Sequence, residues 1–183
     1  MSVPTSEFNQ LLINLTAAEL DSNAKRLAID NVISTGAGNE LDFGSVNITG
    51  GAADSAVKAF CWQVTAYGVN TQVENFRFWL SSNGFDIAGS VIKYATWKLD
   101  AASEWVVNAT TADVGATELP EVEPSQNVFQ GGNGTTASIT SADNDTTEAV
   151  AMFIAVADGE TSGVYKGTDA GNELQFSFKY DYF

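Results

Sequence analysis

Short segments in which apolar and polar residues alternate one by one make up much of this chain, and this alternation limits the fold more than any other feature. Side chains of a β-strand point alternately to the two faces of a sheet, so a period of two predicts strands with one buried face. Gly, Asn and Ser residues of the kind that form turns separate the segments. Segments that alternate, or that are apolar throughout, are 27–33, 41–48, 57–67, 73–80, 91–99, 104–109, 127–129, 149–157 and 173–183.

The sequence therefore predicts an all-β protein, and more specifically a single β-sandwich or jelly-roll-like domain of about seven to nine antiparallel strands. Residues 57–67 place Phe60, Trp62, Val64 and Ala66 on one face of their strand. Residues 149–157 contain no polar side chain, which predicts a strand that is buried on both faces. A turn is expected at residues 81–84.

The N-terminal part of the chain has a different pattern. Apolar residues there follow the spacing i, i+3, i+4 and i+7, which is typical of an amphipathic helix, over residues 5–20. The four residues are Phe8, Leu11, Leu12 and Leu15. We expect a helical segment or arm at residues 1–24, followed by a β-sandwich domain at residues 25–183. The helix would pack on its own domain or contact a neighbouring subunit.

A long and strongly acidic connection, residues 100–148, interrupts the series of strands. No Lys or Arg lies between Lys98 and Lys166, and this stretch holds 11 of the chain's 23 acidic residues. They are Asp100, Glu104, Asp113, Glu118, Glu121, Glu123, Asp143, Asp145, Glu148, Asp158 and Glu160. Three uses are open: a solvated face, a surface for a partner, or a cation site.

A calcium site would lie in residues 143–148. Asp143, Asp145 and Glu148 offer carboxylate oxygens, which are the ligands that Ca²⁺ prefers, but the glycine and spacing of an EF-hand loop are missing. No other cofactor is expected.

The chain contains no histidine and one cysteine, which removes several classes of enzyme. Ser-His-Asp and Cys-His catalysis need an imidazole as the base, and zinc sites need more His or Cys ligands than this chain has. Cys61 lies between Phe60 and Trp62 and is expected to be a small buried side chain. The net charge of −15 argues against nucleic acid as a partner, because binding to phosphates requires a basic surface.

The first residues show neither the basic nor the apolar region of a secretion signal, and the apolar run 149–157 is too short to cross a bilayer as a helix. We therefore expect a protein that is cytoplasmic before assembly, is not inserted in a membrane, and ends in a virion or another extracellular assembly.

Together these features predict a non-enzymatic structural subunit that self-assembles, such as a phage capsid, decoration or tail protein. Its partners would be copies of itself and other structural proteins. The residues expected at subunit contacts are Phe8, Leu11, Leu12, Leu15, Tyr180, Tyr182 and Phe183.

Two alternatives remain open. An adhesive or carbohydrate-binding module would use exposed aromatic side chains to stack on sugar rings, and the candidates are Trp79, Tyr94, Trp97 and Trp105. A glycoside hydrolase that uses two carboxylates is a remote alternative, because no spacing singles out a pair of acids.

Overall fold

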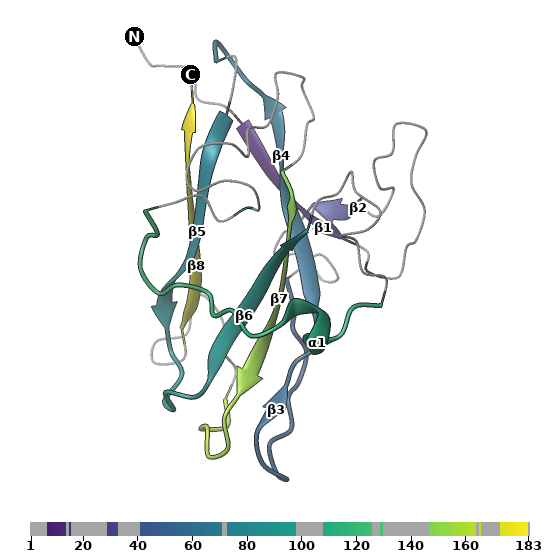
Figure 1. Ribbon diagram of the computed structural model, residues 1–183, viewed down its shortest axis with the longest axis vertical. Helices are drawn as coiled ribbons and strands as arrows, with labels where there is room; N and C mark the ends of the chain where they lie inside the picture. The colour runs from purple at the N-terminus through teal and green to yellow at the C-terminus, as the bar shows by residue number, and fades with distance from the viewer. Residues whose placement is uncertain are drawn as a thin grey trace.

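The long elements of the structure are β-strands that pair antiparallel in two sheets (Figure 1), so the all-β prediction is confirmed. The computed structural model describes residues 7–13, 15, 29–32, 41–70, 73–97, 108–125, 129, 147–163, 165 and 173–182. The strands are β1 (Glu7–Ile13), β2 (Ile29–Val32), β3 (Ala53–Asp54), β4 (Lys58–Ala66), β5 (Val73–Asn83), β6 (Val91–Trp97), β7 (Ala149–Val156) and β8 (Leu174–Tyr182). The helix in the described ranges is α1 (Thr111–Val114). The strands predicted at 104–109 and 127–129 lie largely outside these ranges.

Strand β7 is the centre of the larger sheet, in which the strands follow the order β2-β1-β4-β7. One edge of β7 pairs with β4 and then with β3, and the other edge pairs with β6. Met152 faces the main core between the two sheets. Ala151 and Phe153 face a second apolar cluster on the other side of the larger sheet, which we call the outer cluster. The prediction that this strand is buried on both faces is confirmed.

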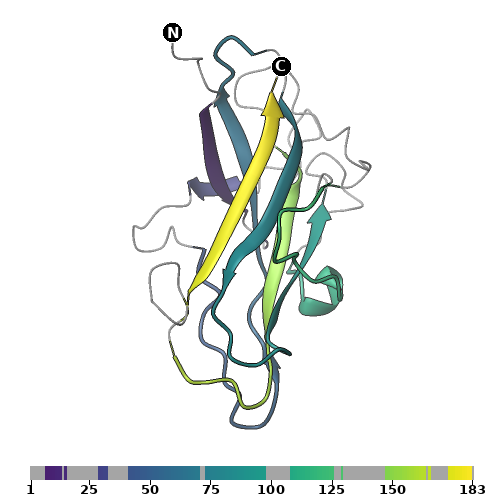
Figure 2. The same ribbon diagram turned by 90° about the vertical axis from the view of Figure 1, so that its left-hand side faces the viewer.

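Strands β5 and β8 form the smaller sheet, which lies in front of the larger one in Figure 2. Aromatic side chains fill the space between the two sheets. Trp62 of β4 is at their centre, with its ring centroid 5.4 Å from those of Phe78 on β5 and Phe178 on β8. The predicted inward face of β4 is confirmed for Phe60, Trp62 and Val64, which are all buried, while Ala66 is half-buried.

The helix predicted at residues 5–20 is wrong, because Glu7–Ile13 form strand β1 of the larger sheet. β1 pairs with β4, with Phe8 opposite Val64 and Leu12 opposite Phe60. A single helix of this length is only marginally stable by itself in water, whereas the sheet provides a hydrogen-bonded partner along the segment. The helical part of the proposed 1–24 arm is thereby replaced by a strand of the sheet.

The strand predicted at residues 41–48 is also wrong, although the alternation there is real. Leu41 and Phe43 pack against the core, but the segment belongs to neither sheet. The side chain of Asp42 accepts a hydrogen bond from the backbone N–H of Gly44, whose φ is +75°. Asn47 makes the same kind of turn with Thr49, and such local bonds compete with a strand ladder.

The turn expected at residues 81–84 begins later than predicted, because β5 continues to Asn83. The chain reverses between β5 and β6, where Ser90 donates a backbone hydrogen bond to the carbonyl of Ile87.

A short segment, residues 117–120, connects the two sheets through backbone hydrogen bonds. Leu119 donates to the carbonyl of Ile92 on β6, and the carbonyl of Pro120 accepts from Leu80 on β5. Tyr94 of β6 donates to the carbonyl of Thr117. This part of the predicted acidic connection is therefore an ordered bridge between the sheets.

Two buried hydroxyl groups replace backbone partners in the larger sheet. Between β3 and β4, the hydroxyl of Ser55 accepts a hydrogen bond from the N–H of Ile154. The hydroxyl of Thr147, just before β7, accepts one from the N–H of Trp62. Both side chains are buried, so these bonds satisfy amides that would otherwise have no partner.

Candidate functional site

An apolar groove of about 980 Å³ opens between the larger sheet and β8. The apolar side chains of Phe60, Phe78, Ile154, Phe176 and Phe178 lie along it and come from β4, β5, β7 and β8. Residues of two irregular segments form most of its remaining walls, namely residues 41–46 and 48 of the first and residues 160–163 and 165 of the second. Its volume is in the range of protein ligand sites, so we take this groove as the candidate functional site.

The wall at residues 41–48 has the side-chain pattern of a strand but not the hydrogen bonds of one. Leu41, Phe43, Val46 and Ile48 are half-buried along the groove, and the residues between them are exposed. Within the part of the chain that the structure describes, the backbone groups of this segment are unpaired except for the N–H of Gly44 and the carbonyl of Ile48. The segment can therefore offer backbone donors and acceptors to another chain.

The other wall is held by a buried carboxylate, Glu160. Its Oε1 accepts hydrogen bonds from the backbone N–H of Asp86 at 2.7 Å and from the hydroxyl of Tyr165 at 2.9 Å. Its Oε2 accepts from the backbone N–H of Ile87 at 3.1 Å and from the hydroxyl of Ser90. Glu160 thus fixes the β5–β6 loop and Tyr165 relative to the end of β7.

The hydrogen bonds also determine how Glu160 and Tyr165 titrate. Burial raises the pKa of Glu160, but the bonds from Ser90, Asp86, Tyr165 and Ile87 together outweigh burial and lower this pKa below its ordinary value. Burial, the hydrogen bond to Glu160 and the negative charge of that carboxylate raise the pKa of Tyr165 to about 12. At neutral pH the pair is therefore a carboxylate and a neutral phenol.

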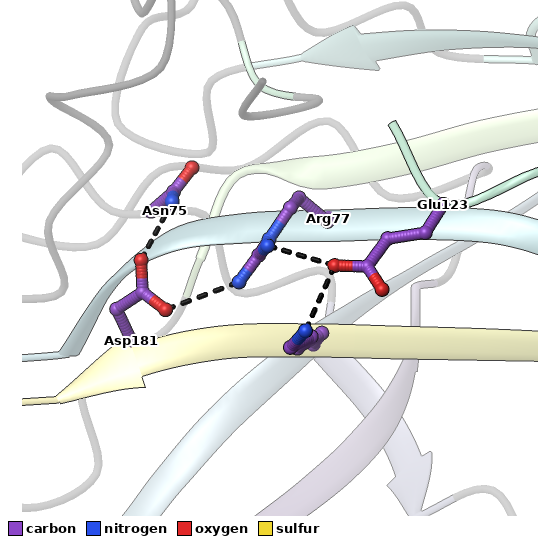
Figure 3. A network of polar contacts seen from close by, with 5 residues as sticks. Asn75, Arg77, Glu123 and Asp181 are labelled. Carbon is purple, nitrogen blue, oxygen red and sulfur yellow. Dashed lines mark hydrogen bonds and ion pairs between the residues drawn. The ribbon is translucent and has the colours of Figure 1, made fainter. Parts of the chain in front are cut away.

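A second polar cluster lies on the outer face of the smaller sheet (Figure 3). Arg77 contacts Glu123 at 2.7 Å and Asp181 at 3.0 Å, and Lys179 contacts Glu123 at 3.0 Å. Asn75, which has a φ of +54°, donates to Asp181 at 2.6 Å beside an irregularity in the β5–β8 pairing. The two positive and two negative charges of this cluster balance. The bond between Asn75 and Asp181 supports the irregularity in the β5–β8 pairing, so the cluster has a structural role.

The acidic residues between Lys98 and Lys166 serve different purposes where the structure describes them. Asp113 caps helix α1 through Thr110, Glu123 pairs with Arg77, and Glu160 is buried at the groove. Nothing in the sequence distinguishes Glu160 from the other ten acids, and sequence reasoning missed its role.

The predicted contact residues lie in different places. Phe8, Leu11 and Leu12 are on β1, Leu15 packs against the outer cluster behind the larger sheet, and Tyr182 pairs with Val73 at the end of β8. Tyr180 packs toward the core, where its ring stacks on that of Phe76 at 5.8 Å. Phe183 lies outside the described residues. The role of all seven in subunit contacts stays a prediction.

The calcium hypothesis is not tested, because Asp143 and Asp145 lie outside the described residues and only Glu148 is inside them. In the described ranges, no group of three or more His, Cys, Asp or Glu residues is arranged to hold a metal ion. No helix in the same ranges is long and apolar enough to cross a membrane.

The aromatic candidates for sugar stacking are less available than the sequence suggested. Trp97 is buried in the outer cluster, and Tyr94 is half-buried against the main core. Trp79 is half-buried on the smaller sheet, and Trp105 lies outside the described residues. Trp97 therefore cannot be part of an exposed platform.

Cys61 is fully buried on the face of β4 toward the outer cluster, as predicted. Burial raises the pKa of its thiol to about 12, so the thiol stays protonated at neutral pH. We expect the native protein to react with Ellman's reagent at pH 8 at least about 100-fold more slowly than the protein in 6 M guanidinium chloride. Equal rates in the two conditions would contradict this burial.

Comparisons with protein-family models, with curated proteins and with solved structures find no match to this chain.

Proposed function

We propose that this chain is a β-sandwich that serves as a non-enzymatic structural subunit of a larger assembly. The strand order β1-β4-β7-β6 facing β5-β8 supports the sandwich. It corresponds to strands A-B-E-D facing C-F of the immunoglobulin-like arrangement, in which seven strands form two packed sheets. This order favours a sandwich over a jelly roll.

One observation carries the functional proposal, namely the apolar groove whose wall at residues 41–48 has a strand-like pattern and unpaired backbone groups. Open backbone groups beside apolar surface are a template for pairing with another chain, and native proteins normally cover or avoid them. Contact with a neighbouring subunit covers such a surface. The setting that we propose is a virus particle, as a capsid, decoration or tail component.

Charge would regulate this assembly. At −15 per chain, free copies repel one another at low ionic strength, and salt reduces this repulsion because the Debye length falls to about 8 Å at 0.15 M. Association is therefore expected to strengthen as salt is added.

Multi-angle light scattering after size-exclusion chromatography tests self-assembly. We expect the molar mass at about 100 μM protein to exceed that of one chain in 0.5 M NaCl, and to fall toward one chain in 0.02 M NaCl. Because β1 belongs to the larger sheet, deleting residues 1–20 would damage the fold and is not a suitable control. Self-assembly would be refuted by a molar mass of one chain at both salt concentrations, together with the failure of a chemical cross-linker to join copies of the chain.

A further inference from the structure

The dipeptide Asn83-Gly84 lies where strand β5 ends and the loop to β6 begins. A backbone nitrogen that belongs to glycine can attack the carboxamide of a preceding asparagine, because glycine has no Cβ to obstruct the approach. Asn83 is exposed, so water also reaches it. This dipeptide therefore has the sequence and the solvent access that the attack requires.

A local hydrogen bond fixes the carboxamide of Asn83 beside the backbone of Gly84. Its Oδ1 accepts from the backbone N–H of Phe85 at 3.1 Å, and the turn closed by this bond contains the Gly84 nitrogen. The bond withdraws electrons from Cγ of Asn83, and the same N–H can stabilise the negative charge that develops on Oδ1 during an attack. The turn thus holds the nucleophile and its target together and activates the target.

The amide nitrogen of the same side chain attaches β5 to the bridge at residues 117–120. Asn83 Nδ2 donates to Glu121 Oε1 at 2.5 Å. Glu121 directly follows Pro120, whose carbonyl accepts from the backbone N–H of Leu80. A carboxylate in place of the carboxamide cannot donate to Glu121 and puts a second negative charge beside it. Loss of the amide would therefore turn an attractive contact into a repulsive one.

We propose that Asn83 is a site of spontaneous deamidation, and that the reaction weakens the attachment of the bridge to β5. The Gly84 nitrogen bonds to Cγ of Asn83, its proton passes to Nδ2, and the Cγ–Nδ2 bond breaks to release ammonia. Water then opens the cyclic succinimide. The product is aspartate, or isoaspartate where water adds to the main-chain carbonyl. This modification goes beyond the function proposed above and does not depend on it.

Peptide mapping by mass spectrometry measures the reaction during incubation at about pH 8 and 37 °C. Trypsin releases Asn83 in the peptide that ends at Lys93, apart from Asn133, which precedes the other Gly of this kind in the sequence. We expect native Asn83 to react at a rate within about tenfold of its rate in 6 M guanidinium chloride. The proposal is overturned if native Asn83 stays intact while the unfolded chain is converted.

Gly84→Ala is the matched variant for the chemical step. The φ of Gly84 is outside the left-handed region, so alanine fits the backbone there, but its Cβ obstructs the attack. We expect the reaction at Asn83 to be at least about tenfold slower in this variant, and equal rates would refute attack by the Gly84 nitrogen. If thermal unfolding shows that Gly84→Ala is not folded, Asn83→Gln takes its place. It keeps an amide but needs a larger ring, and should stay unmodified.

Hydrogen exchange at the Leu80 amide reports the attachment of the bridge, because this N–H bonds to Pro120. Asn83→Asp reproduces the new charge and keeps an acceptor for Phe85. In about 0.02 M NaCl we expect it to speed exchange at Leu80 at least about twofold. Glu121→Gln, added to Asn83→Asp, removes the repulsion and should restore most of the original rate. Unchanged exchange in Asn83→Asp, or no effect of adding Glu121→Gln, would refute the weakening of the bridge.

Discussion

Replacement of Trp62 by alanine is expected to lower the free energy of unfolding by about 3–5 kcal/mol, the range for large aromatic residues in a packed core. Trp62 is fully buried between the sheets, and its ring lies within 6.2 Å of the rings of five phenylalanines. Removing it leaves a cavity that the rigid strands on both sides cannot close. Urea denaturation measures the loss, which should appear as a lower midpoint with an unchanged m-value.

Trp62→Phe is the matched control for this experiment. The indole Nε1 is buried and has no hydrogen-bond partner in the described part of the chain. Phenylalanine retains an aromatic ring at the centre of the core and removes this unsatisfied donor, so the variant should lose less than about 1.5 kcal/mol. Equal losses for the two substitutions would show that Trp62 does not pack as described.

The second large effect is expected at Glu160. Each carboxylate oxygen accepts one backbone N–H, from Asp86 or from Ile87. In Glu160→Gln, either orientation of the amide places its NH₂ group against one of these N–H groups. We expect a loss of about 2–4 kcal/mol, because a partly buried backbone donor loses its acceptor and the charged hydrogen bonds disappear. Asp158→Asn removes the same charge at an exposed residue nearby and should cost less than about 0.5 kcal/mol.

The pH dependence of unfolding provides an independent measurement on Glu160. Its pKa in the folded protein is below the ordinary value of 4.5, so its carboxylate stabilises the fold fully above about pH 4.5. This stabilisation is lost as the pH falls through the folded pKa. The wild-type protein should therefore lose stability more steeply than Glu160→Gln below pH 4.5, measured by urea midpoints between pH 3 and 7. Parallel curves for the two proteins would contradict an ionised, hydrogen-bonded Glu160.

Strands could be predicted from the sequence where local pattern and tertiary environment agree. The alternation at β4 and the unbroken apolar run at β7 both predicted the observed burial, because these strands are in the middle of the larger sheet. At β1, the spacing of Phe8, Leu11 and Leu12 favours a helix, because in a strand only Phe8 and Leu12 belong to the same face. The pairing with β4, which is distant in sequence, decides in favour of the strand, and no local rule contains that partner.

The candidate site was less predictable than the fold. The alternation at residues 41–48 correctly identified which side chains face inward, but Asp42 and Asn47 make local turns that prevent a ladder. The role of Glu160 depends on amides more than seventy residues away in the chain, and a side chain's distant partners leave no mark in its local sequence.

The bridge at residues 117–120 has a mechanical consequence. Two sheets that touch only through apolar side chains can slide over each other without breaking any directional bond. Here the backbone of Leu119 and Pro120 is bonded to β6 on one side and to β5 on the other. Shear between the sheets must therefore break backbone hydrogen bonds as well as disturb packing, which makes the two layers one stiff unit that can transmit force.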